Sequence, residues 1–265
     1  MKQMPHESPP KQTADAANIE PAAQSGALNA RDFSTQQTLQ FAESATEGRP
    51  GLRILEVGCG RGHLAKALVD MGHSVLPIDI SEEAVSFARS LGLSAKQTDI
   101  FGVKDSKFDC VLFARSLHHI TPLDESLRQA ALLLDEGGFV VLEDFDFTKM
   151  DEKTAVWLRG VQNTLSSVGI AAAEHFDIGN AFRDLMNYYS EHRLHTGKQL
   201  IEALRNVFRK VEISEGGPWL YSSFVPRAES QAKGYELIEA IFEWEQFQIE
   251  KGFIQGLGLR AIAFR

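Results

Sequence analysis

Cysteine is scarce in this chain, whose 265 residues include only Cys59 and Cys110. Neither has a second thiol nearby or the spacing of metal ligands, so the sequence predicts neither a disulfide scaffold nor a zinc site. Chains without a disulfide framework are typical of reducing compartments, and we therefore expect a cytoplasmic location.

Clustered positive charge is missing as well. The formal net charge is −9, the isoelectric point is about 5.4, and no run of Lys or Arg occurs. Nucleic acids are bound by basic surfaces, so this balance argues against a nucleic-acid substrate. No apolar run approaches the roughly 18 residues that a membrane span needs. The first 25 residues lack the apolar core of a secretory signal, and we expect a disordered tail over residues 1–28.

Strand-like and helix-like segments alternate from about residue 50 to residue 145, after a helical segment at 30–45. The predicted strands are 53–57, 74–78, 94–97, 108–113 and 139–143, and Asp135-Glu136-Gly137-Gly138 before the last strand is expected to form a turn. Helices between successive strands imply right-handed crossovers. The sequence therefore predicts an α/β fold with a doubly wound, mostly parallel sheet.

The alternation stops after Glu143 and returns near residue 196. Residues 145–193 contain helical stretches with interspersed aromatic residues, and we expect them to be a helical insertion that acts as a lid over an acceptor. A helix over 196–208, a strand over 211–214, a helix over 235–251 and a closing strand over 259–264 follow. We therefore expect one domain over residues 29–265.

The segment from Glu56 to His63 reads as a buried strand that runs into a glycine loop and then a helix. Glycines at 58, 60 and 62 let the backbone approach a ligand closely, and N–H groups at a helix start suit electron-rich groups. We expect Glu56 to hold the glycine backbone. The dinucleotide spacing would require a third glycine at position 63, where His63 stands. A tight turn without a ligand is the alternative interpretation.

Carboxylates follow the next two predicted strands. In an open parallel sheet, ligands lie beyond the carboxyl ends of the strands, which is where Asp79 and Asp99 stand. Asp79 can accept both hydroxyls of a ribose, and Asp99 can accept an adenine amino group. Ile80 and Ile100 can then pack on the two faces of the ring. The alternatives are a helix cap for Asp79 and a solvated loop position for Asp99.

The pattern Glu-x-Gly-x-Gly-x-Gly over 56–62 and the Leu-His-His segment after the strand at 108–113 resemble motifs I and IV of class I S-adenosylmethionine (SAM) dependent methyltransferases. The resemblance implies SAM as cofactor and S-adenosylhomocysteine (SAH) as product, and it places Ala114 and Arg115 beside the methionine part. Metal-dependent relatives carry acidic ligands at this strand end, so no metal is expected. The predicted cofactor residues are Glu56, Gly58, Cys59, Gly60, Gly62, Asp79, Ile80, Asp99, Ile100, Ala114 and Arg115.

Two sets of residues are candidates for chemistry and acceptor binding. His118 and His119 can act as general bases near neutral pH, although either can instead order the loop. Glu143, Phe145 and Tyr188 are candidates for contact with the acceptor, although Phe145 can equally close the core. Carboxylates that alternate with phenylalanines after the fifth strand suit a cationic or aromatic acceptor.

The sequence thus predicts a SAM-dependent methyltransferase that modifies an oxygen or nitrogen atom of a small molecule. It does not identify the methyl acceptor, and it leaves open whether the chain forms a homodimer. The alternatives are a protein or tRNA methyltransferase, a SAM-binding protein that transfers no methyl group, and an NAD-binding oxidoreductase.

Overall fold

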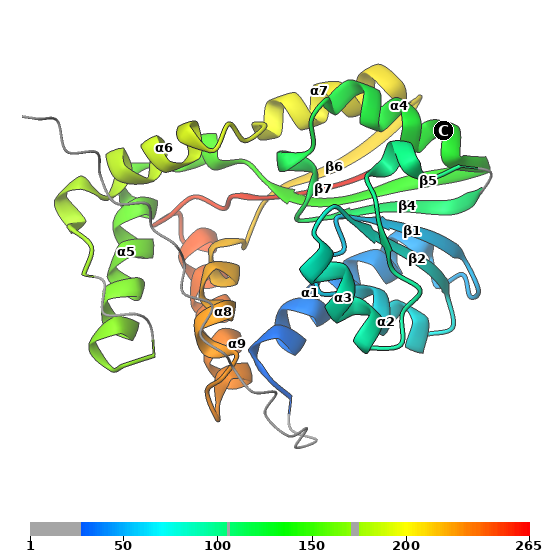
Figure 1. The fold of residues 1–265 in the computed structure, drawn as a ribbon. Helices are drawn as coiled ribbons and strands as arrows, with labels where there is room; N and C mark the ends of the chain where they lie inside the picture. Colours follow the sequence, from blue (N-terminus) through cyan, green and yellow to red (C-terminus); the bar gives the residue numbers. More distant parts are fainter. Residues whose placement is uncertain (1–27, 105–106, 171–174) are drawn as a thin grey trace, which may run out of the picture.

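A seven-stranded sheet organises the chain in the computed structural model, which describes residues 28–104, 107–170 and 175–265. The strand order is β3-β2-β1-β4-β5-β7-β6, and β7 runs antiparallel to both of its neighbours. This arrangement confirms the predicted α/β fold with a mostly parallel sheet (Figure 1). The strands are β1 (Arg53–Val57), β2 (Ser74–Asp79), β3 (Lys96–Gln97), β4 (Phe108–Ala114), β5 (Leu134–Phe145), β6 (Lys210–Gly217) and β7 (Gly258–Phe264).

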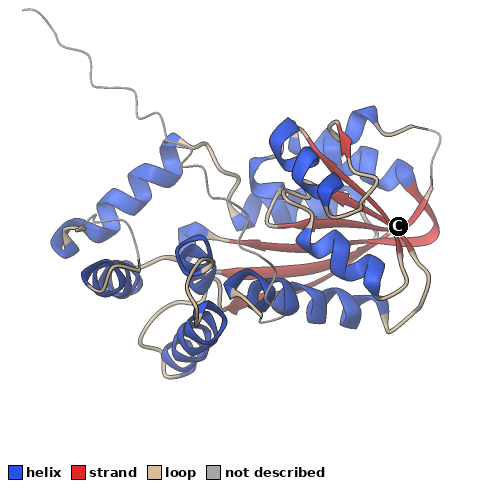
Figure 2. Ribbon diagram, turned by 60° about the horizontal axis from the view of Figure 1, so that its bottom comes forward, coloured by secondary structure: helices blue, strands red, loops and turns tan. Residues whose placement is uncertain are grey.

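Helices cover both faces of the sheet (Figures 1 and 2). On one face, α4 (Leu123–Leu133) and α7 (Gly197–Val207) bury leucines such as Leu127 and Leu204 against the strands. On the other face, α1 (Ala30–Thr46) and α2 (His63–Asp70) pack over β1 and β4, and α3 (Glu82–Ser90) packs on α2. Strands covered on both faces explain the continuous apolar runs of β4 and β5.

A second group of helices lies at the carboxyl ends of the strands. It comprises α5 (Glu152–Ser167), α6 (Ala181–Glu191), α8 (Val225–Ala228) and α9 (Gly234–Glu250), and we call it the helical cap. The cap has its own apolar core, which includes Leu158, Leu185 and Ile238 and also takes Phe33 from α1. The core of the cap therefore combines residues from between β5 and α7 with residues from between β6 and β7. The sequence analysis did not link these two segments.

The prediction of a turn at Asp135–Gly138 is wrong. These residues belong to β5, which begins at Leu134 and pairs with β4 through a register shift between Phe108 and Cys110. Two adjacent glycines suggested a turn, but a strand tolerates glycine at such an irregularity, where the ladder bends. Most of the expected tail, residues 1–27, lies outside the described residues. Among the helices that are described, none is long and apolar enough to cross a membrane.

Candidate active site

The glycine loop between β1 and α2 is tied to the end of β2. The backbone N–H groups of Gly58 and Cys59 donate to the carbonyl oxygen of Ile78 at 2.9 and 3.0 Å. Gly60 has a positive φ of 52°, and a Cβ added there would meet no atom within 4 Å. A Cβ at Gly58 would instead come within 2.6 Å of the Ser116 Cβ. The loop is therefore packed on one side and open at Gly60 on the other.

Asp79 holds this loop, a role that we expected of Glu56. Its Oδ2 accepts the N–H of Gly60 at 2.8 Å, and its Oδ1 accepts the N–H of Ser81 at 2.9 Å. Asp79 thus also supports the start of α3, where Ser81 is the N-cap. Asp99 likewise caps a short helical turn, since its Oδ1 accepts the N–H groups of Phe101 and Gly102. Asp99 therefore has the exposed loop position of its alternative interpretation, whereas the N-cap of α3 is Ser81 and not Asp79. Both carboxylates also line a cavity.

That cavity has a volume of about 600 Å³ and lies beyond the ends of β1, β2 and β4. Asp79, Asp99 and Ile80 line it, and Ile80 is 75% exposed although it is a large apolar residue. Ile100 also reaches the cavity, but its side chain is buried in the core. An exposed isoleucine beside two carboxylates suits the apolar face and polar edges of a nucleoside.

A second cavity, of about 250 Å³, lies on the other side of the glycine loop. Cys59, Gly60, Gly62 and Ala114 line it, together with Glu56. Glu56 is only 2% exposed, and its Oε2 has no hydrogen-bond partner among the described residues. Burial, and then the charge of Asp79, raises the pKa of Glu56 to about 8. A buried hydrogen-bond acceptor that has no partner in the described part of the chain suits the ammonium group of a ligand.

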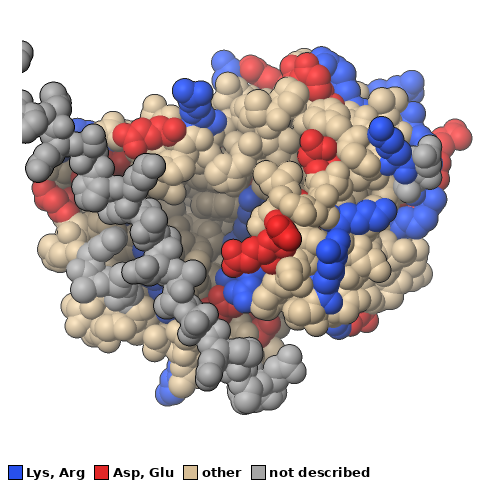
Figure 3. All heavy atoms as spheres, in the orientation of Figure 1, with Lys and Arg blue, Asp and Glu red and all other residues tan. Residues whose placement is uncertain are grey.

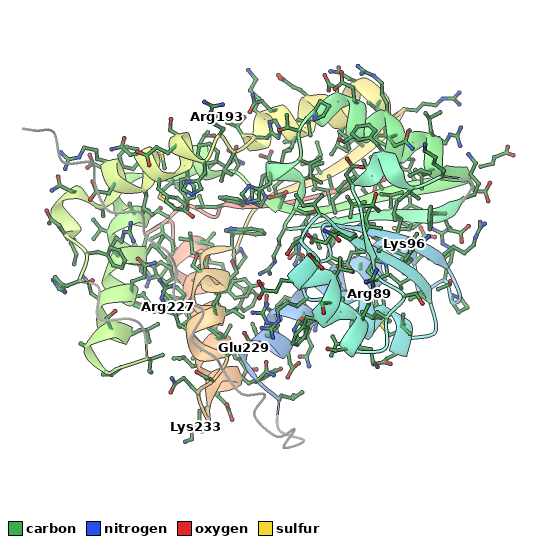
Figure 4. All side chains as sticks on the ribbon, viewed as in Figure 1. Arg89, Lys96, Arg193, Arg227, Glu229 and Lys233 are labelled. Carbon is green, nitrogen blue, oxygen red and sulfur yellow. The ribbon has the colours of Figure 1, made fainter. Side chains whose placement is uncertain are left out.

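The first helix closes the second cavity. Ser34 and Thr38 of α1 line it, as does Arg31. The Arg31 guanidinium forms an ion pair with Glu229 at 2.7 Å, and this pair links α1 to the end of α8. Figure 4 shows Glu229 between the cap helices and α1. Because Gly58 and Arg115 line both cavities, the two together form an elongated site that suits a nucleoside joined to an amino acid.

Arg115 stands at the junction of the two cavities. Its φ of 58° is unusual for a residue with a side chain. Its Nη2 donates to the Tyr221 hydroxyl at 2.9 Å and to Oε1 of Glu143 at 3.3 Å. Glu143 is 3% exposed and also accepts from Thr38 and Arg260. Glu143 therefore holds Arg115 within a buried ion network.

The two adjacent histidines have different surroundings. His118 is buried, and its Nδ1 lies 2.7 Å from Oδ1 of Asp144, a fully buried carboxylate. His119 lines the larger cavity, and its ring centre lies 4.1 Å from that of His118. Burial, and then the charge of His118, lowers the pKa of His119. His119 is thus the histidine that faces the ligand site, and the buried His118 packs against its ring.

Aromatic side chains from the cap meet the end of β5. Phe145 is buried and stacks on Trp219, with ring centres 4.9 Å apart and nearly parallel planes. The Arg115 guanidinium lies over the Trp219 ring at 5.1 Å. Tyr188 is 52% exposed and contacts Tyr189 and His192 on the outer side of α6. Figure 3 shows this face of the molecule hollowed between the cap and the sheet.

Sequence reasoning missed Trp219 and Tyr221, which no motif marks. Both follow β6, and β6 runs parallel to β5 because each pairs antiparallel with β7. The rule that ligands lie beyond the carboxyl ends of strands could have found them, had it been applied to the sixth strand. Among the described residues, no group of three or more His, Cys, Asp or Glu side chains is placed to hold a metal ion.

A sequence model of a methyltransferase domain family matches residues 29–207. The chain therefore belongs to this family of methyltransferase domains. This result and the fold confirm the predicted resemblance to the class I SAM-dependent methyltransferases.

Two relatives illustrate the match. A ubiquinone biosynthesis O-methyltransferase of Idiomarina loihiensis is 29% identical over 146 residues, which cover 52% of this chain and 54% of the relative. One of Xanthomonas campestris is 35% identical over 108 residues, which cover 37% of this chain and 45% of the relative. The chain thus spans about half the length of these curated relatives.

A solved structure shows the shared fold over more of the chain. The SAM-dependent methyltransferase from Archaeoglobus fulgidus has a TM-score of 0.55 at 18% identity, and the alignment covers 89% of this chain and 94% of that chain.

Proposed function

We propose that this chain transfers a methyl group from SAM to a hydroxyl oxygen of a small molecule. The observation that supports this best is the elongated double cavity, with Asp79 at one end, Glu56 at the other and His119 beside the junction. The two relatives carry the name O-methyltransferase, which favours oxygen over nitrogen as the accepting atom. A cytoplasmic location remains part of the proposal.

The residues present fit SAM. Asp79 and Asp99 would hold the nucleoside, Ile80 would cover its ring, and Glu56 would accept from the amino group of the methionine part. SAM supplies a methyl group on a sulfonium, which is the electrophile of the transfer. The chain itself would contribute orientation and a site sheltered from water, because such transfers depend strongly on how the reacting atoms are aligned.

His119 would act as the base for the acceptor hydroxyl. Its lowered pKa keeps the ring neutral near pH 7, so one ring nitrogen can accept a proton. The buried hydrogen bond between His118 and Asp144 fixes the His118 ring, and the His119 ring packs against it. Proton removal would then make the oxygen a better nucleophile as the methyl group moves.

The acceptor would lie against the side of Arg115 that faces the cap. Phe145 and Trp219 form an aromatic wall there, and Tyr188 on α6 would contact a larger acceptor from outside. An aromatic wall suits a planar acceptor. Glu143 would contribute through Arg115, with which it is paired.

The test is incubation of the purified chain with methyl-labelled SAM and a set of small phenols and alcohols, followed by mass spectrometry of the products. We expect label in an O-methyl product and SAH as coproduct. Label in tRNA or protein would overturn the proposed acceptor class. SAH binding in calorimetry without turnover on any acceptor would favour a binding protein, and NADH binding at this site would favour an oxidoreductase.

A further inference from the structure

Glu245, in the middle of α9, is a buried carboxylate with an unusual set of partners. Its exposed fraction is 0%, and it forms no ion pair with a described lysine, arginine or histidine. Three consecutive backbone N–H groups donate to it instead, from Trp219, Leu220 and Tyr221, at 2.7, 2.8 and 2.7 Å. Burial of a carboxylate is costly unless such donors compensate it.

These three N–H groups begin a short helical turn, Leu220–Phe224. The first N–H groups of a helix have no partner within it, and this turn has no side-chain cap of its own. Glu245 supplies the missing acceptors from a position on α9 that is more than twenty residues further along the chain. The carboxylate therefore fixes the backbone at Trp219 and Tyr221 in particular.

The two aromatic residues held in this way are the ones that contact Arg115. Tyr221 accepts a hydrogen bond from its Nη2 at 2.9 Å, and Trp219 lies under its guanidinium while it stacks on Phe145. Arg115 in turn lines both cavities of the site. A chain of direct contacts thus leads from Glu245 to the proposed acceptor side, although Glu245 itself lines neither cavity.

We propose that Glu245 is a positioning residue, which holds Trp219 and Tyr221 against Arg115 and so determines where the acceptor lies. The acceptor side of this inference rests on the proposed function, whereas the effect of Glu245 on Trp219 does not. A carboxylate suits this position because both of its oxygens accept. A glutamine would keep one oxygen but turn an amide N–H₂ toward a backbone N–H, and at least one of the three contacts would be lost.

The experiment uses the full chain labelled with 5-fluorotryptophan and ¹⁹F NMR. The chain has three tryptophans, and Trp219→Phe assigns the resonance of interest. We expect Glu245→Gln to shift and broaden the Trp219 resonance. Smaller changes are expected at Trp244, which neighbours the substitution, and at Trp157, which packs on Trp244. Glu243→Gln is the matched control, because Glu243 is an exposed glutamate on the same helix. An unmoved Trp219 resonance in a folded Glu245→Gln protein would overturn the proposal.

Should Glu245→Gln fail to fold, Glu245→Asp provides the second variant. It keeps the charge but shortens the side chain, so Trp219 should still shift; a Trp219 resonance identical to that of the native chain would refute the inference. With an acceptor in hand, the KM of the variant for that acceptor should rise about tenfold, because Trp219 and Tyr221 no longer hold Arg115 as in the native chain. SAH affinity should change by a smaller factor. SAH binding by the native chain tests the proposed function separately.

Discussion

The Oδ2 atom of Asp79 lies 2.8 Å from the backbone nitrogen of Gly60, so the end of β2 holds the glycine loop of β1 in place. One carboxylate therefore shapes the loop and also lines the larger cavity. A change at Asp79 alters both the contacts with a nucleoside and the loop that approaches the rest of the ligand.

Asp79→Ala should weaken SAH binding by about 1–3 kcal/mol, the cost of leaving buried hydrogen-bonding groups without a partner. Isothermal titration calorimetry measures this directly. Asp70→Ala is a suitable control, because Asp70 lies on α2 and pairs with Lys66 at the surface. Equal SAH affinity in native and Asp79→Ala protein would contradict the site, as would NADH binding that depends on Asp79.

Gly60→Val should abolish SAH binding while the fold survives. The new side chain would point into the smaller cavity, where a Cβ meets no protein atom, so only the ligand is displaced. The positive φ adds strain of roughly 1–2 kcal/mol. Gly72→Val isolates that strain, because Gly72 also has a positive φ and free space but lies in the turn after α2. Calorimetry and circular dichroism together decide the outcome, and retained SAH affinity in Gly60→Val would rule out this placement.

Much of this site could be predicted from the sequence, because its residues lie at the ends of strands that the sequence indicates. The glycine loop, Asp79 and Asp99 each follow a recognisable strand, so parallel packing alone brings them to one edge of the sheet. Glu56 and Glu143 were less predictable, because a sequence shows their position but not their partners. Trp219 could have been found by the same rule applied to the sixth strand. Glu245 could not, because its role arises from contact between α9 and the segment after β6, which no local pattern encodes.

Glu56 should make stability depend on pH. Its folded pKa of about 8 lies above the ordinary value of 4.5, so the unfolded chain binds fewer protons between these two values. Stability should therefore fall as pH rises through this window, by up to roughly 1.4 kcal/mol per pH unit from this group. Denaturant unfolding at pH 5.5 and 7.5 measures the difference.

Glu56→Gln should reduce that pH dependence, because a neutral side chain remains buried at both pH values. Glu43→Gln, at an exposed position of α1, should leave it as in the native chain. The same pH slope in the Glu56→Gln and native proteins would show that Glu56 is ionised in the folded state.

His119→Ala should lower kcat by about 10²–10⁴-fold if His119 removes the hydroxyl proton, the usual contribution of a general base. Because the pKa of His119 is lowered, the native rate should hold at neutral pH and fall only in more acidic solution. His118→Asn keeps a polar group beside Asp144 and should reduce kcat less. A rate and pH profile unchanged in His119→Ala would remove His119 from the chemistry.

The segment over residues 145–193 should act as a lid whose mobility depends on ligand, and the described helices α5 and α6 should differ. The buried residues of α5 number six, including Leu158 and Val161, so this helix should stay protected in every state. Only Ala181 and Leu185 of α6 are buried, which leaves that helix weakly held beside the end of β5. Binding of SAH with product should order α6, because Tyr189 on it contacts Phe145 and Phe147 beside the proposed acceptor wall.

Amide hydrogen exchange followed by mass spectrometry separates the two helices, with α5 as the internal reference. We expect exchange in α6 to slow by at least tenfold when SAH and product are bound, which corresponds to about 1.4 kcal/mol of added local stability. Exchange in α5 should not change. Closure of this kind would shield the transfer from water and complete the acceptor pocket. High and equal protection of α6 with and without ligand would instead make it a fixed wall of the site, since a helix that never opens cannot gate the entry of an acceptor.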